Sequence, residues 1–105
     1  MGVTFSGGEP FCQAHQLAHL ARQIKEYDGE LDIVTYTGYT LEYLLENSDD
    51  KNCYKELLNE IDYLVDGKFE KYKKSYLLKF KGSSNQRIID VKKSLESNNV
   101  VETEF

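Results

Sequence analysis

The sequence predicts an α/β fold in which parallel strands are joined by helical crossovers. Three short segments, residues 2–5, 31–36 and 62–66, are rich in β-branched and apolar residues, and each runs into a glycine-bearing turn. Helical periodicity fills the stretches between them. A strand–helix–strand order implies parallel strands with right-handed crossovers. The length of 105 residues allows one small domain, which we place at residues 1–105.

The first helix is predicted from about residue 11 to residue 27, where Asp28-Gly29 ends it. Its apolar residues recur at helical spacing and are Ala14, Leu17, Ala18, Ala21 and Ile24. After the second strand, Thr40 can cap the next helix, whose apolar face is formed by Leu41, Leu44 and Leu45. Residues 48–50 interrupt that periodicity, and residues 54–61 restart it.

The carboxyl-terminal part begins with "KGSSNQR", residues 81–87, which has the composition of a loop. We predict a short strand in "RIID", residues 87–90, with Asp90 capping a helix that runs through about Ser97. Residues 100–105 are predicted as a last strand at an edge of the sheet.

Charge and hydropathy exclude several classes of partner. The net charge of −5 argues against nonspecific binding of nucleic acid. No apolar run approaches the ~20 residues that cross a membrane, and no secretory signal is recognisable, so we expect a cytoplasmic protein with neither nucleic acid nor membrane as partner. Lysines interleaved with aromatic residues crowd residues 68–81. That segment could bind single-stranded nucleic acid or a partner protein. We favour a solvent-exposed connecting segment whose aromatic rings pack inward.

The two cysteines, Cys12 and Cys53, lie far apart in sequence. A disulfide is not expected in a cytoplasmic chain, and this chain alone does not supply the cysteines of an iron–sulfur cluster. Cys12, His15 and His19 share one helix face and could hold zinc with one position open. A partly exposed polar face explains the two histidines equally well, so we assign no metal site.

Glycine-bearing turns follow all three predicted parallel strands, at Gly7-Gly8, Gly38 and Gly67. Because ligands of such sheets bind beyond the carboxyl ends of the strands, we expect these turns to gather at one binding edge. Asp66 and Lys68 flank Gly67 and could converge on the same ligand. The alternative is an ordinary set of turns, with a turn-capping aspartate beside a solvated lysine.

Four blocks of the sequence carry a family resemblance: "GVTFSGGEP", "DIVTYTGYTLEYLL", "LVDGKFE" and "FKGSSNQRIIDVKKSL". In order and spacing they resemble the anaerobic ribonucleoside-triphosphate reductase activating proteins. This family is a branch of the radical S-adenosylmethionine enzymes and is related to the pyruvate formate-lyase activating enzyme. The resemblance implies a partial radical-SAM-type (β/α) barrel, S-adenosylmethionine as cofactor and a [4Fe–4S] cluster held by three cysteines. It also implies an oxidoreductase that generates a glycyl radical on a partner, the anaerobic ribonucleoside-triphosphate reductase.

The same resemblance assigns the cofactor-binding residues, which are Gly7, Gly8, Glu9, Thr37, Asp66, Gly67 and Lys68. The first three match a GGE motif that meets the amino group of the methionine moiety. Thr37 matches a position near the ligand, and the last three match a D-x-K motif that contacts S-adenosylmethionine in the related activase. A family signature of unassigned role includes Ser84, Asn85 and Arg87.

The CxxxCxxC cluster motif of the family is absent from this sequence. We therefore expect the carboxyl-terminal portion of an activase, without the first β-α unit and without a cluster, inactive alone and binding S-adenosylmethionine weakly. We also expect self-association through the exposed edge of the strand at residues 2–5. The alternative is a non-catalytic binding or regulatory module that contacts a partner protein.

Overall fold

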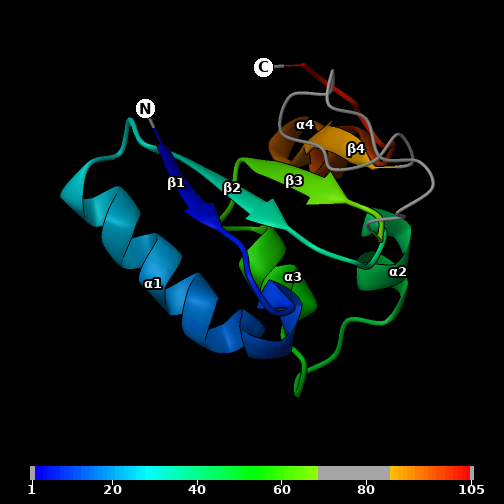
Figure 1. The fold of residues 1–105 in the computed structure, drawn as a ribbon, viewed down its shortest axis with the longest axis horizontal. Helices are drawn as coiled ribbons and strands as arrows, with labels where there is room; N and C mark the ends of the chain where they lie inside the picture. Colours follow the sequence, from blue (N-terminus) through cyan, green and yellow to red (C-terminus); the bar gives the residue numbers. More distant parts are fainter. Residues whose placement is uncertain (1, 69–85, 105) are drawn as a thin grey trace.

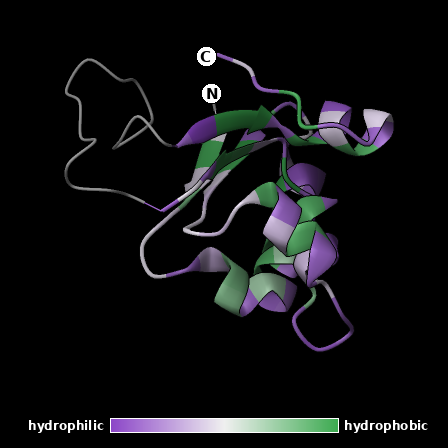
Figure 2. Ribbon diagram, turned by 90° about the vertical axis from the view of Figure 1, so that its right-hand side faces the viewer, coloured by the Kyte–Doolittle hydropathy of each residue, from purple (hydrophilic) through white to green (hydrophobic). Residues whose placement is uncertain are grey.

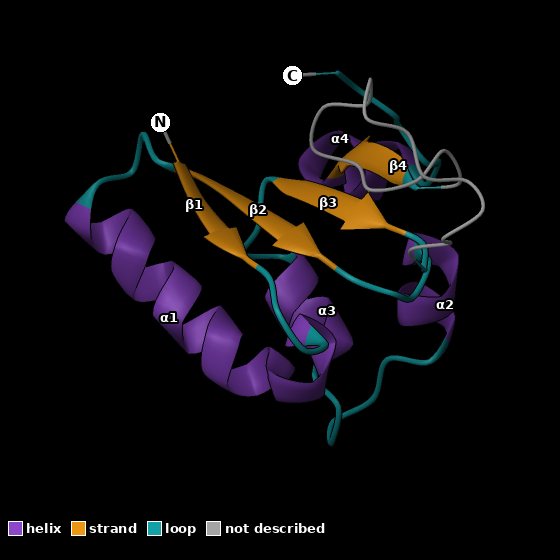
Figure 3. Ribbon diagram, viewed as in Figure 1, coloured by secondary structure: helices purple, strands orange, loops and turns teal. Residues whose placement is uncertain are grey.

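A computed structural model describes residues 2–68 and 86–104 of the chain (Figures 1 and 3). The elements, in order, are β1 (Gly2–Phe5), the 3₁₀ helix η1 (Pro10–Gln13), α1 (Ala14–Tyr27), β2 (Asp32–Tyr36), α2 (Leu41–Glu46), α3 (Tyr54–Leu58), β3 (Tyr63–Asp66), β4 (Arg87–Asp90) and α4 (Val91–Ser97). The lysine-rich segment beyond Lys68, together with Ser84 and Asn85, lies outside the described residues. Within the described ranges, no helix is long and apolar enough to cross a membrane.

The strands form one sheet in the order β1-β2-β3-β4. The pairs β1–β2 and β2–β3 are parallel, which confirms the predicted crossovers. The expectation of an all-parallel sheet is wrong for β4, which runs antiparallel to β3. Asp66 lies opposite Arg87 in the register, so the chain leaves β3 and enters β4 at the same end of the sheet. The described strands thus form an open mixed sheet, and the partial barrel implied by the family resemblance stays a prediction.

All four α-helices contribute to a core on one face of the sheet. The strand residues that point into it are Phe5, Ile33, Leu64 and Ile89, as the two-residue alternation of a strand requires. Figure 2 shows largely apolar strands beside helices that mix apolar and hydrophilic residues. Val65 and Ile88, which pair in register, are buried outside this core, on the opposite face. The described helices therefore pack on the face of the sheet that carries Phe5, Ile33, Leu64 and Ile89.

The helix boundaries follow from local hydrogen bonding. Thr40 accepts a hydrogen bond from the Tyr43 amide at 3.1 Å, and Asp90 accepts one from the Lys93 amide at 2.9 Å, so both predicted caps are confirmed. Helix α1 ends at Tyr27, as predicted from Asp28-Gly29. The strand β3 starts one residue later than predicted, because Asp62 uses its carboxylate to accept from the Ile33 amide at 2.8 Å.

The carboxyl-terminal segment lies beside β4, away from β1. The Asp90 amide donates to the Val101 carbonyl and the Thr103 amide donates to the Ile88 carbonyl, each at 2.8 Å. These bonds frame an isolated antiparallel bridge between Ile89 and Glu102, so a bridge replaces the predicted last strand. Among the described strands, β1 pairs only with β2, and its outer edge has no strand neighbour.

A buried ion pair joins β3, β4 and α2. The Asp66 side chain is 1% exposed, and its carboxylate accepts from Arg87 Nε at 2.9 Å and Nη2 at 2.5 Å. It also accepts from the Leu41 amide at 2.8 Å, at the start of α2. Arg87 reaches on to Glu42 at 2.6 Å and holds the pKa of that carboxyl below its usual value. One carboxylate thus fixes three elements at the carboxyl end of the parallel strands.

Replacing Arg87 with methionine should lower the free energy of unfolding by roughly 3 kcal/mol, because Asp66 would remain buried without its cation. Chemical denaturation would measure this loss. The matched control is Glu42→Gln, which removes the exposed partner of the same guanidinium and should cost less than about 1 kcal/mol. Equal losses from the two variants would contradict the structural role given to Asp66.

Candidate functional site at the carboxyl ends of the parallel strands

The loops after β1, β2 and β3 meet at one small open cavity. Its volume is about 230 Å³, and it is lined by Gly8, Tyr36, Thr37, Gly38, Gly67 and Gln86. The predicted gathering of the glycine turns at one edge of the sheet is therefore confirmed. Three of the six are glycines, whose amides and carbonyls no side chain screens, which suits a ligand that is recognised through the backbone.

Glu9 ties the first loop to the second. Its carboxylate accepts from the Thr37 hydroxyl at 2.9 and 3.0 Å and from the Gly38 amide at 2.7 Å. It also accepts from the Phe11 amide at 3.0 Å, which caps η1. These contacts make Glu9 a positioning group that holds the two loops together.

Gly7 and Gly8 are required by backbone conformation. Their φ angles are 75° and 49°, in the left-handed region that disfavours residues with a Cβ. A Cβ built at either position would meet no heavy atom within 4 Å, so space does not select glycine there. Open space above a left-handed glycine pair leaves the backbone accessible to a ligand.

Thr37 and Tyr36 form the wall contributed by β2. Thr37 is buried, and its hydroxyl oxygen accepts from the Tyr39 amide at 3.1 Å while its proton goes to Glu9. Its amide donates to the Val65 carbonyl at 3.0 Å and so fixes the loop against β3. Burial raises the pKa of the Tyr36 phenol above its ordinary value.

Aromatic rings support the loop after β2 from the helical side. Tyr39 stacks on Tyr43 with ring centroids 4.7 Å apart, and Tyr54 lies 6.0 Å from both Tyr39 and Phe11. Burial, with Tyr39 close by, raises the pKa of Tyr54 to about 12. The cluster packs this loop, η1 and the two short helices against one another.

The predicted pair Asp66 and Lys68 does not converge in the structure. The Asp66 carboxylate is turned into the ion pair with Arg87 and does not line the cavity, whereas Lys68 is exposed beyond Gly67. Gln86, which was not predicted as a site residue, lines the cavity. Its side-chain amide donates to the Gly67 carbonyl at 3.0 Å. In the sequence, Gln86 and Arg87 are marked only by belonging to the family signature "GSSNQR", and that signature does not by itself indicate what either residue does.

The potential metal ligands of η1 and α1, which are Cys12, His15 and His19, do not come together in the structure. Among the described residues, His15 lies with Cys53 and Glu56, whereas Cys12 and His19 do not join that group. The His15 Nδ1 atom is 2.7 Å from Glu56 Oε1. Cys12, His15 and His19 therefore do not form the possible zinc site considered from the sequence. His15 instead lies close to two other potential metal ligands, Cys53 and Glu56.

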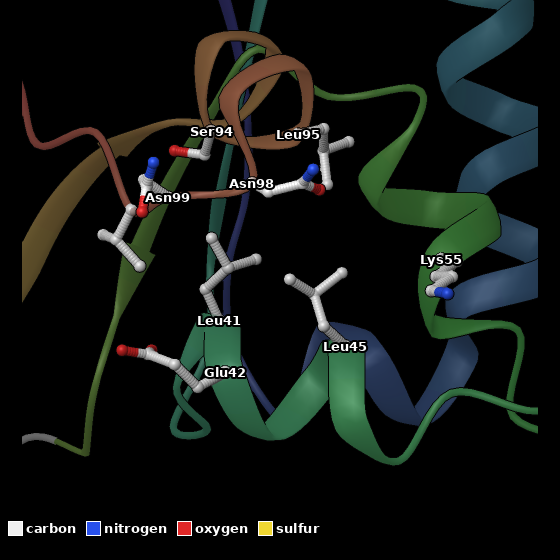
Figure 4. A pocket seen from close by; sticks show the side chains of 9 residues that line it. Leu41, Glu42, Leu45, Lys55, Ser94, Leu95, Asn98 and Asn99 are labelled. Carbon is white, nitrogen blue, oxygen red and sulfur yellow. The ribbon is translucent and has the colours of Figure 1, made fainter.

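A larger cavity, of about 410 Å³, lies between α2 and α4. Figure 4 shows Leu41 and Leu45 of α2 facing Ser94 and Leu95 of α4. The Ser94 hydroxyl already donates to the Asp90 carbonyl and accepts from the Val101 amide. This cavity shares no lining residue with the one at the glycine loops, so it is not the candidate site.

Comparison with known proteins places the chain in a family. A family model described as a 4Fe-4S single cluster domain matches residues 1–89. Three similar relatives are each called anaerobic ribonucleoside-triphosphate reductase-activating protein. The one from Pasteurella multocida is 36% identical over 90 residues, with 83% of this chain and 54% of the relative covered. The one from Vibrio cholerae is 39% identical over 89 residues, with the same two coverages.

The relative from Enterobacteria phage T4 is 32% identical over 89 residues, covering 83% of this chain and 51% of the relative. The chain thus spans about half the length of the curated relatives it matches. No solved structure matches it significantly. These relatives confirm the resemblance to the activating proteins of anaerobic ribonucleoside-triphosphate reductase. Since the family model covers residues 1–89, the chain belongs to the family of 4Fe-4S single cluster domains.

Proposed function

We propose that this chain provides the S-adenosylmethionine-binding loops of an activating protein for anaerobic ribonucleoside-triphosphate reductase. The observation that carries the proposal is the meeting of three glycine-bearing loops at one cavity beyond the parallel strands. Such an edge is where α/β sheets bind their ligands. The names of the relatives support the reaction and the partner enzyme.

The groups beside the cavity are of the kind that could bind the amino-acid end of S-adenosylmethionine. The accessible backbone of Gly7 and Gly8 can meet the charged amino-acid end of S-adenosylmethionine without a Cβ in the way. Glu9 and Thr37 hold the two adjoining loops at fixed separation, and Gln86 holds the third through Gly67. By the family resemblance, the bound cofactor supplies the radical that removes hydrogen from a glycine of the reductase.

The cysteines do not fit a three-thiolate cluster. The sequence contains two, Cys12 beside α1 and Cys53 at the start of α3, and neither belongs to the cavity. A [4Fe–4S] cluster of the family type needs three cysteine thiolates, and this chain alone lacks them. The residues present therefore account for cofactor binding, and no step of the reaction is assigned to them.

S-adenosylmethionine should bind the isolated chain with a dissociation constant no tighter than roughly 100 μM, about −5.5 kcal/mol. In the family its amino and carboxylate groups chelate a cluster iron, and this chain alone does not supply the cysteines for that cluster. Gly8→Val should abolish that binding, since a β-branched residue is strongly disfavoured at a φ of 49°. Isothermal titration calorimetry would measure both. Gly29→Val is the matched control, in the turn after α1, where an added Cβ makes ordinary contact at 3.6 Å.

Micromolar binding that survives Gly8→Val would show that the glycine loops are not the site. Loss of binding in Gly29→Val as well would point to general unfolding, which circular dichroism would report. Binding that is weak, lost in Gly8→Val and kept in Gly29→Val supports the proposal.

A second candidate function is self-association or partner binding through β1. Within the described residues, the outer edge of β1 has no neighbouring strand, and residues 2–5 carry neither proline nor charge. Unpaired N–H and C=O groups at such an edge recruit another strand. A two-fold pairing of this edge with a second copy is the simplest arrangement.

Light scattering over a concentration series should therefore show a dimer or larger species. Thr4→Lys should shift the equilibrium toward monomer, because a lysine on an edge strand discourages pairing. The matched control is Thr103→Lys, beyond β4 at the other end of the sheet, which should leave the assembly unchanged. A monomer at every concentration would exclude the β1 edge as a self-association surface.

A further inference from the structure

A second cluster of reactive side chains lies between α1 and α3, apart from the glycine loops. Figure 1 shows these two helices packed side by side beneath the sheet. His15 comes from the first turn of α1, Cys53 is the residue before α3, and Glu56 lies in α3. One potential ligand atom from each residue lies within 4.8 Å of the other two.

We propose that His15, Cys53 and Glu56 form a binding site for a divalent transition-metal ion of the zinc class. Imidazole nitrogen, thiolate sulfur and carboxylate oxygen are the three donor types that zinc takes in proteins. Magnesium and calcium prefer oxygen donors alone, so the mixed set discriminates against them. Three protein ligands leave a fourth tetrahedral position for water.

The geometry needs only a small adjustment to bind an ion. Tetrahedral zinc with bonds of about 2.0–2.3 Å separates its ligand atoms by roughly 3.3–3.7 Å. His15 Nδ1 and Glu56 Oε1 are 2.7 Å apart, so they would separate slightly, and the more distant contacts within 4.8 Å would close. The His15 side chain is 68% exposed, which leaves the imidazole free to make this movement.

The other two ligands are held in place. Cys53 has a left-handed backbone with a φ of 57°, and its amide donates to the Asp49 carbonyl at 3.0 Å. Glu56 accepts from Arg22 through Oε2 at 2.9 Å, which directs Oε1 toward His15. Outer contacts of this kind orient metal ligands. Arg22 also binds Glu60, so its charge is partly balanced by a second carboxylate.

The local charge favours a cation. The carboxylates of Asp49, Asp50 and Glu56 lie near the Cys53 thiol. A divalent ion placed among the same carboxylates would be attracted by them and would stabilise the thiolate as its ligand. The negative charges around Cys53 are therefore consistent with a bound divalent cation.

The chain provides its own matched controls. Cys12 and His19 have the same chemistry as Cys53 and His15, lie in or next to the same helix, and are outside the cluster. An ion held by any accessible cysteine and histidine would depend on all four residues. An ion held by the cluster would depend on Cys53 and His15 only.

The test is zinc binding to the 105-residue chain under reducing conditions, measured by competition with a chromogenic chelator. One equivalent should bind, and cobalt in its place should give a thiolate-to-metal charge-transfer band. His15→Gln and Glu56→Gln should each weaken zinc binding by at least roughly 10- to 100-fold, which is the loss that removal of an outer contact alone causes. Cys53→Ser should remove the cobalt band, whereas Cys12→Ser and His19→Gln should change neither measurement.

Two results would overturn the proposal: less than one equivalent of bound zinc, or zinc binding that depends on Cys12 and His19 as much as on Cys53 and His15. Circular dichroism of each variant checks the fold. Should Cys53→Ser unfold, the exposed His15→Gln variant still decides the outcome, because its solvent-exposed side chain contributes little to packing.

Discussion

The buried carboxylate of Asp66 is the constraint on which this end of the molecule depends. An ionised carboxylate without solvent needs a cation and hydrogen-bond donors, and Asp66 obtains them from Arg87 and the Leu41 amide. Those partners belong to β4 and to the start of α2. Satisfying one buried charge therefore sets where β4 lies, where α2 begins and how the loop after β3 leaves the sheet.

Glu9 does for the first two loops what Asp66 does for the third. Both acidic residues look like ligand contacts in sequence, yet the side chains of both are occupied by protein donors. What remains for a ligand at the cavity is mainly the backbone of the glycine loops. Glu9 and Asp66 hold the loops in position, and the glycines leave the loop backbone accessible to a ligand.

The sequence predicted the features that depend on local chemistry or on the geometry of parallel strands. The caps at Thr40 and Asp90 and the meeting of the glycine loops belong to this group. The direction of β4 was not predictable, because the apolar run in residues 87–90 has the same composition in either orientation. Nor were the partners of Asp66 and His15, since they lie 21 and 41 residues away and become neighbours only through the fold.

The two faces of the sheet explain how the cavity can be open although the core is closed. Thr35 points into the helical core and is fully buried, so the next residue, Tyr36, must belong to the opposite face. Tyr36 lines the cavity, which therefore joins the end of the sheet to the face that the described helices leave uncovered. On that face Val65 and Ile88 are buried, although no described helix covers them. A ligand at the cavity would therefore meet the sheet at the carboxyl ends of the parallel strands and not across its buried middle.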